Sequence, residues 1–130
     1  MPEFTNEERA DLIKRYPFLS MGCGEGDEYC WADYIPIGWW LAFGDKLCAD
    51  LAEAIEKDGV QKTFSIYEIK EKYGMLEIYC NFSESVWNVV RRYESLSRDI
   101  CINCGKKATI FKKNGWVVPL CDNCYEEACE

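Results

Sequence analysis

The sequence predicts an α+β fold in which a β-hairpin or small antiparallel sheet and two main helices form one domain, and a cysteine-rich unit closes the chain. Three patterns predict it. Apolar residues recur at helical spacing over residues 38–58 and 83–97, and two strand-like runs surround a turn within residues 62–82. A chain of 130 residues can bury one core of useful size but not two. We therefore expect a core domain over residues 1–99 and a smaller unit over residues 100–130 docked on it.

The composition is that of a globular protein, because 48% of the residues are hydrophobic and 15% are aromatic. No apolar run approaches the roughly twenty residues of a membrane span, and residues 1–8 lack the basic start and apolar stretch of a signal peptide. We therefore expect a cytoplasmic protein. In that reducing compartment the nine cysteines are expected to be metal ligands and buried thiols rather than disulfides.

The formal net charge is −8, and residues 1–60 account for it with 13 acidic and 5 basic side chains. This acidic half repels phosphate backbones, so it disfavours non-specific nucleic-acid binding by the whole molecule. A well-solvated surface is the simpler explanation of the acidity.

The first expected element is a short helix. Thr5-Asn-Glu-Glu8 has the form of a capping box, with Thr5 before the first turn and Glu8 three residues later. The helix should end near Arg15, because Tyr16 precedes Pro17 and a residue before proline avoids helical backbone angles. It has few apolar positions, so we expect it on the outside of the fold.

Residues 20–37 form the least regular stretch, with three glycines near its start. Glu25, Asp27 and Glu28 line this loop. Carboxylates in a flexible loop could hold a hard cation, but the order of the residues is not that of an EF-hand.

Residues 38–58 are expected to form the central helix of the domain, about five turns long, with its charged residues on the side opposite the core. Asp58-Gly59 is typical of a helix C-terminus. The predicted core positions are Trp40, Phe43, Leu47, Leu51, Ala54 and Ile55.

Residues 62–70 and 75–82 are rich in β-branched and aromatic types and flank Lys72-Tyr-Gly74, so they predict a β-hairpin. In the second strand apolar and polar residues alternate, which places one face against helices and leaves the other wetter. The predicted buried positions of that strand are Leu76, Ile78, Cys80 and Phe82.

A second main helix should begin after Ser83 or Ser85, either of which is a suitable N-cap. It leads into Cys101 with almost no linker, so the C-terminal unit is expected to dock on the core. The predicted buried stripe is Val86, Val89, Val90, Tyr93 and Leu96.

Two Cys-x-x-Cys pairs separated by sixteen residues define the C-terminal unit: Cys101 with Cys104, and Cys121 with Cys124. This is the spacing of a zinc ribbon, in which each pair forms a tight turn and the chain goes out and back between them. We predict one structural Zn²⁺ held by these four thiolates. Disulfides or metal-free thiols are the alternatives.

The segment between the two pairs fits that interpretation. Residues 108–112 and 116–120 are strand-like, and Asn114-Gly115 between them supplies the positive φ angles of a tight hairpin turn. Ligand spacing and turn chemistry therefore agree.

The other cysteines allow a second hypothesis. Cys23, Cys30, Cys48 and Cys80 could form a second zinc site, but their spacings fit no known zinc turn, so buried thiols are the default expectation. Nothing in the sequence assigns a role to Cys129.

A larger set of motifs resembles a family of small bacteriophage and prophage proteins of unknown function. It comprises a Gly38-Trp39-Trp40 helix leading to Leu47-Cys48, a Lys70-Glu-Lys-Tyr-Gly-Met-Leu76 strand, and the Cys-x-x-Cys-Gly ribbon. The similarity covers roughly residues 38–124, although the last pair is Cys-Asp-Asn-Cys where relatives have a Cys-Asp-x-His ending. The resemblance implies a phage protein in the host cytoplasm. It also implies that the protein binds and disables host machinery, as small acidic proteins of that context commonly do.

Enzymatic activity is not expected. The chain has no histidine, which excludes histidine triads and histidine general bases. A four-cysteine zinc site is coordinatively closed, and no phosphate-binding glycine motif is present.

We therefore favour a protein-binding function. Aromatic side chains beside an acidic loop suit a basic protein surface that normally holds nucleic acid. The partner would be a host protein, such as a CRISPR component or another nucleic-acid-binding defence protein, which the phage protein inhibits or redirects. The candidate contact residues are Tyr29, Trp31, Tyr34, Glu25, Asp27 and Glu28.

A nucleic-acid-binding accessory function is the alternative. Residues 91–113 carry a local charge of +5, and Phe111 and Trp116 could stack on bases. The simpler explanation is that the lysines protect a strand edge and that Trp116 packs under the zinc site or against the docking helix. The candidate residues are Lys106, Lys107, Lys112, Lys113 and Trp116.

Overall fold

The computed structural model describes residues 4–21 and 29–129, and it confirms the α+β class. The elements are α1 (Asn6–Arg15), 3₁₀ turns at Pro17–Leu19 and Trp31–Tyr34, α2 (Ile37–Trp39), a π-helical turn (Trp40–Gly44), α3 (Asp45–Asp58), β1 (Ile66–Lys72), β2 (Met75–Cys80), α4 (Glu84–Ser97), β3 (Thr109–Lys113), β4 (Trp116–Leu120) and α5 (Asp122–Cys129).

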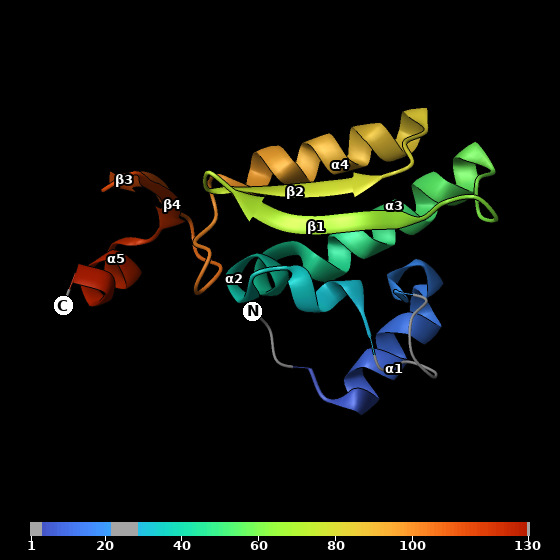
Figure 1. Cartoon of the computed structure of the whole chain (residues 1–130), viewed down its shortest axis with the longest axis horizontal. Coiled ribbons are helices and arrows are strands. Elements are labelled where there is room, and N and C mark those ends of the chain that lie inside the picture. The colour runs from blue at the N-terminus through green and yellow to red at the C-terminus, as the bar shows by residue number, and fades with distance from the viewer. Residues whose placement is uncertain (1–3, 22–28, 130) are drawn as a thin grey trace.

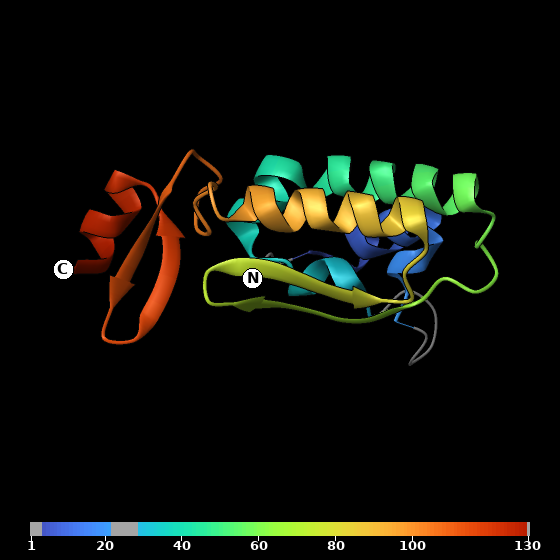
Figure 2. The ribbon, with the colours of Figure 1, turned by 90° about the horizontal axis from the view of Figure 1, so that it is seen from above.

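The core has two layers. Helices α3 and α4 lie side by side, and the antiparallel β1–β2 hairpin packs against them with its strands running along the helices, so one face of the hairpin is covered and the other faces outward (Figures 1 and 2). The unit formed by β3, β4 and α5 projects from one end of the molecule, next to the turn between β1 and β2 (Figure 2). Within the described residues, no helix combines the length and apolarity needed to cross a bilayer.

Helix α1 begins as predicted. The Thr5 backbone N–H donates to Glu8 Oε1 at 2.9 Å, and the Glu8 N–H donates to Thr5 Oγ1 at 3.1 Å, which completes the capping box. Leu12 and Ile13 are buried in a small cluster with Leu19, Cys30, Ala32 and Cys48. The helix therefore covers a secondary core of its own.

The long helical segment contains a deviation that the sequence did not predict. A π-helical turn over Trp40–Gly44 widens the helix, so the core face shifts by one residue towards the N-terminus. Trp39 is fully buried as a result, whereas Trp40 is only partly buried and packs edge-on against Phe4. The prediction of Trp40 as the core tryptophan was wrong, and that of Phe43 was right.

The first hairpin has the expected turn. Lys72 pairs with Met75, and Tyr73 and Gly74 between them have φ angles of 52° and 79°, the left-handed pair of a two-residue turn. Strand β1 begins at Ile66, later than predicted. Phe82 was wrongly placed in the core, because β2 ends at Cys80; its ring is exposed and lies edge-on to Trp87.

Helix α4 begins after Ser83 and buries the predicted valines and Tyr93, but not Leu96, which is 39% exposed. Ser97 takes the buried position instead. Its Oγ accepts a hydrogen bond from the Leu76 N–H at 2.9 Å, and Glu94 Oε2 accepts one from the Ile78 N–H at 3.0 Å. Two polar side chains of α4 thus satisfy the outer edge of β2, which a two-stranded sheet would otherwise leave unpaired.

The C-terminal unit meets the core at the start of the long helical segment. The Gly38 N–H donates to the Ile102 carbonyl at 2.9 Å, and Trp39 Nε1–H donates to the Ile100 carbonyl at 3.0 Å. A Cβ on Gly38 would lie 2.1 Å from the Cys101 carbonyl oxygen. Only glycine allows the two backbones to come this close.

Candidate metal centre

The first cysteine pair lies on the loop between α4 and β3. The Cys101 N–H donates to the Lys106 carbonyl at 2.7 Å, and the Gly105 N–H donates to the Cys101 carbonyl at 3.0 Å. Gly105 has a φ of 85°, which permits the tight turn that brings Cys104 back beside Cys101.

The second pair joins β4 to α5. Cys121 follows the last residue of β4, and Cys124 lies in the first turn of α5, where its N–H donates towards Cys121 Sγ at 3.5 Å. Sequence reasoning missed α5. The signal was the helix-favouring run Glu126-Glu127-Ala128 immediately after the second pair.

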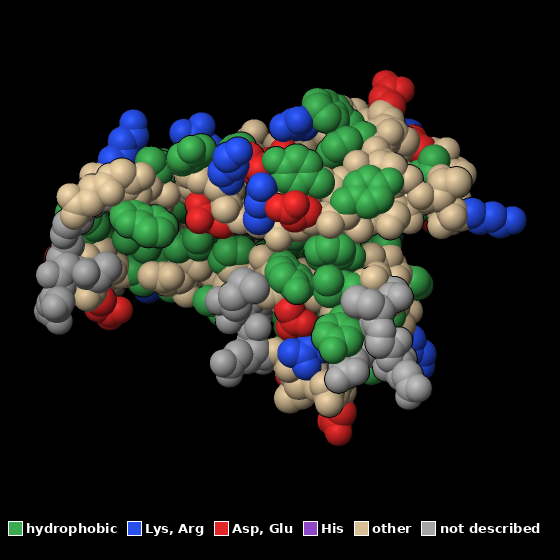
Figure 3. All heavy atoms as spheres, viewed as in Figure 1, with side chains coloured by type: hydrophobic (Ala, Val, Ile, Leu, Met, Phe, Trp, Pro, Cys, Tyr) green, Lys and Arg blue, Asp and Glu red, His purple; other side chains and the backbone are tan. Residues whose placement is uncertain are grey.

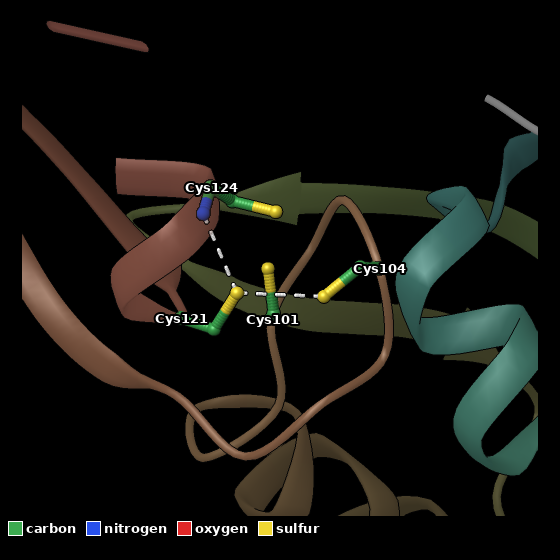
Figure 4. A group of neighbouring side chains, drawn as sticks. All are labelled: Cys101, Cys104, Cys121 and Cys124. Atoms are coloured by element: carbon green, nitrogen blue, oxygen red, sulfur yellow. Dashed lines mark hydrogen bonds between the residues drawn. The ribbon is translucent and has the colours of Figure 1, made fainter. Parts of the chain in front are cut away.

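The four sulfurs point towards a common centre, although they come from two distant parts of the sequence (Figure 4). All lie within 4.8 Å of one another, and the Sγ atoms of Cys104 and Cys121 are 3.5 Å apart. Zinc–sulfur bonds of about 2.3 Å in a tetrahedron place sulfurs about 3.8 Å apart, so this group has the size of a four-thiolate zinc site. Cys101 is buried and the other three are half-buried.

The local backbone stabilises a thiolate at Cys101. Burial raises the pKa of the Cys101 thiol, but hydrogen bonds from the backbone N–H groups of Cys121, Asn103 and Cys104 outweigh it and lower the pKa to about 6. The neighbouring thiols of Cys121 and Cys101 raise the pKa of Cys124.

The expectation that the other cysteines are buried thiols is confirmed for Cys30, Cys48 and Cys80, and they do not form a second zinc site. Cys30 and Cys48 are buried in the cluster beneath α1, and Cys80 is buried in the main core. Among the described residues, the four C-terminal cysteines are the only group that could hold a metal ion. Cys23 lies outside the described residues.

Only some of the residues predicted to bind a protein are exposed on the surface. Tyr29 and Tyr34 are exposed, but Trp31 is half-buried and packs against both apolar clusters of the core. The acidic residues Glu25, Asp27 and Glu28 lie outside the described residues.

The residues predicted to bind nucleic acid are exposed wherever their side chains are described. Lys106, Lys107 and Lys112 are exposed, while the Lys113 side chain is not among those described. Trp116 is 74% exposed, so the explanation that it packs under the metal site or against a helix was wrong.

Phe111 is already engaged within the C-terminal unit. Its ring stacks on that of Tyr125 with centroids 4.0 Å apart. The Phe111 ring face that was predicted to stack on a base is therefore covered by Tyr125.

The outer face of the first hairpin is a candidate site that sequence reasoning missed. Tyr67, Tyr73 and Tyr79 are exposed there and lie among lysines and glutamates. Hydrophobic and charged side chains alternate over this face in the space-filling view (Figure 3). Strand alternation signals Tyr79, which lies between the buried residues Ile78 and Cys80. It does not signal Tyr67, at the irregular pairing near the start of β1, or Tyr73, in the turn.

No family model, curated protein or solved structure matches this chain. The resemblance to phage proteins is therefore a prediction from the sequence motifs alone.

Proposed function

We propose that this chain is a non-enzymatic binding protein of phage origin, stabilised by one structural zinc, that binds and inhibits or redirects a protein of its bacterial host. The observation that carries the proposal is the uncovered outer face of the β1–β2 hairpin. Antiparallel sheets commonly leave one face to solvent, but that face is usually polar. Here it presents several large aromatic rings.

The metal part of the proposal follows from the donor set. Four thiolates at this spacing favour zinc over harder cations such as Mg²⁺ or Ca²⁺, which take oxygen ligands. The four sulfurs fill a tetrahedral shell and leave no position for a reacting water, so the metal would be structural. Cys101, Cys104, Cys121 and Cys124 would then hold the two halves of the C-terminal unit together.

The chemistry of the hairpin face suits a protein partner. Lys70 Nζ lies 3.1 Å from Glu68 Oε1 and 5.4 Å from the ring centroid of Tyr79, and the Tyr79 hydroxyl donates to Glu77 Oε2 at 2.6 Å. Charges of both signs are therefore paired around the aromatic rings. Tyrosine gives a large contact area at little cost in side-chain entropy, and a balanced polar frame is typical of protein interfaces.

The surface extends beyond the hairpin. The 3₁₀ turn at Trp31–Tyr34 lies beside β1 in Figure 1. Tyr29, just before that turn, and Tyr34, its last residue, are both exposed. The predicted contact residues Tyr29 and Tyr34 therefore join the aromatic hairpin face in one proposed interface. The net charge of −8 favours a basic partner, such as a nucleic-acid-binding defence protein.

Affinity capture from a lysate of the bacterial host, treated with nuclease, tests this function. Any retained protein is purified and its affinity is measured for the wild type and for a Tyr67→Ala/Tyr79→Ala variant. We expect the variant to lose at least 10-fold in affinity, because interface tyrosines are frequent hot spots. Leu96→Ala removes an exposed apolar side chain of α4 outside this face and is the matched control. Equal affinities of all three proteins would contradict the assignment of the surface.

A second candidate function is supported by one observation, the exposure of Trp116 beside the lysines of the ribbon. In this alternative the C-terminal unit binds nucleic acid and the protein is an accessory factor. Replacing Lys106, Lys107 and Lys112 by glutamine would remove nucleic-acid binding and spare capture of the host protein. The tyrosine variant would do the reverse.

A further inference from the structure

The turns of the two hairpins border a cleft of about 300 Å³. One wall carries Tyr73, from the β1–β2 turn, and the other carries Trp116, the first residue of β4. These rings are 72% and 74% exposed, the highest values among the large apolar side chains of the described residues. The remaining lining residues are Glu71, Lys72, Asn114, Gly115 and Val117.

The two walls are held in place by contacts between the hairpins. Gly74 approaches β4 so closely that a Cβ there would lie 3.1 Å from the Val117 carbonyl oxygen and 3.3 Å from Pro119 Cδ. Glu71 Oε2 accepts a hydrogen bond from the Gly74 N–H at 2.8 Å, so this carboxylate is engaged within the turn. The cleft is thus formed where the core and the C-terminal unit meet, and both contribute an aromatic ring.

Two lysines near the cleft outnumber its one carboxylate, Glu71, which keeps its negative charge while it accepts the hydrogen bond from Gly74. The Lys72 ammonium lies 5.8 Å from the centroid of the Tyr73 ring. Lys112 pairs directly with Val117 across β3 and β4, and side chains that are directly opposite in an antiparallel pair leave on the same face. Lys112 is therefore on the face of the ribbon hairpin to which the lining residue Val117 belongs.

We infer that this cleft binds single-stranded nucleic acid, with a base stacked on Tyr73 or Trp116 and the phosphates beside Lys72 and Lys112. Exposed aromatic rings next to lysines are what sequence-tolerant single-strand binding requires, because every base has a stacking face and every linkage has a negative charge. A duplex would not fit this site, since its bases are already stacked on one another. The inference rests on the second candidate function and assigns it a site that includes the core residues Tyr73 and Lys72.

The test is fluorescence anisotropy of a labelled 12-nucleotide oligothymidylate titrated with zinc-loaded protein at low and at physiological salt. We expect Tyr73→Ala and Trp116→Ala each to weaken binding by about 5-fold to 100-fold. Replacing Lys72 or Lys112 by glutamine should weaken it less and lower the slope of log affinity against log salt by about one per lysine. Trp87→Ala is the matched control, an exposed aromatic side chain of α4 outside the cleft, and it should bind like the wild type.

Each contrary outcome has a separate meaning. If the oligonucleotide binds and neither aromatic substitution weakens it, the cleft is not the site, although the ribbon remains a nucleic-acid-binding unit. If no binding occurs with the wild type, both the cleft and the second candidate function are overturned. If Trp116→Ala and Tyr73→Ala instead abolish capture of a host protein, the cleft belongs to the protein interface and the inference is wrong. Circular dichroism of each variant confirms that the fold is retained, which both exposed positions should allow.

Discussion

The core and the C-terminal unit differ in how much apolar surface they bury. The main core buries a continuous cluster of sixteen residues between the hairpin and its helices. The C-terminal unit has a cluster of three, Cys101, Ala108 and Leu120, and one of these is a metal-ligand candidate. Apolar burial of that size does not offset the loss of chain entropy in about thirty residues, whereas it can in the core. Four cysteines are concentrated in this part of the chain, where a bound metal would supply the stabilisation that apolar burial does not.

The first prediction separates the two units by removing the proposed metal. Zinc contributes on the order of 10–16 kcal/mol to the folding of small zinc domains, so chelation or Cys104→Ser should unfold residues 101–129. The core should stay folded. Hydrogen exchange measured by mass spectrometry would show fast exchange in β3 and β4 and unchanged protection in α3, α4 and β2.

A matched cysteine variant makes this test specific. Cys80→Ala removes a buried thiol of the main core, so it should lower the melting temperature while the protein still holds one zinc. Simultaneous loss of protection in the core and the ribbon on chelation would mean that the two units unfold as one, and the contrast between them would not hold.

The second prediction breaks the seam between the units. Gly38→Ala would place a Cβ 2.1 Å from the Cys101 carbonyl oxygen and 2.5 Å from the Ile102 carbonyl carbon. Backbone cannot move away as a flexible side chain does, so we expect a loss of about 3 kcal/mol or more in the free energy of unfolding. Urea denaturation measures it.

Gly59→Ala is the control for this substitution. Gly59 ends α3 with a φ of 67°, and a methyl group added there would meet nothing within 4 Å. The free energy of unfolding should fall by only about 1 kcal/mol, the cost of placing alanine in a left-handed backbone conformation. If both alanine variants cost the same, the approach at Gly38 does not hold the units together.

The sequence was sufficient for the elements that depend on local chemistry. The capping box at Thr5, the Tyr73-Gly74 and Asn114-Gly115 turns and the end of α3 at Gly59 all occur where the turn and cap residues predicted them. The four-cysteine group also formed as the spacing indicated. Each cap, turn and Cys-x-x-Cys pair is encoded within a few residues, and the spacing between the two pairs is that of a zinc ribbon.

Errors arose where a tertiary contact decides the outcome. Periodicity selected Trp40 for the core because it assumes 3.6 residues per turn, and the π-helical turn put Trp39 there. Leu96 was predicted to be buried because it continues the apolar stripe, but Ser97 is buried in its place, since the unpaired edge of β2 requires a polar partner there. The cleft at Tyr73 joins two hairpins that are distant in sequence, so no local pattern predicted it.

The third prediction concerns that edge, where the core depends on polar contacts. Ser97→Ala leaves the Leu76 N–H without its acceptor inside a fully buried site. An unsatisfied buried donor costs about 1–3 kcal/mol, which should be lost from the free energy of unfolding in urea. Ser95→Ala, two residues earlier on the exposed side of α4, should change it little. A result within 0.5 kcal/mol of wild type for both, roughly the usual surface effect, would show that the edge does not need this hydrogen bond.

The smallest expected effect is at Glu94, the other residue that covers the β2 edge. Burial raises the pKa of the Glu94 carboxyl above its ordinary value of 4.5, and hydrogen bonding from the Ile78 N–H and the charge of Arg91 oppose this only in part. The folded protein therefore holds this proton more tightly than the unfolded chain, so the group costs stability as the pH rises from 4.5 through its raised pKa. Glu94→Gln keeps an acceptor for Ile78 and does not ionise.

The difference in melting temperature between this variant and the wild type should therefore grow in favour of the variant from pH 4 to pH 8. A constant difference over that range would mean that ion pairing with Arg91, 3.1 Å away, fully offsets the burial. In that case the edge of the core would be held by charge, and its contrast with the ribbon, where we propose a bound metal, would be weaker.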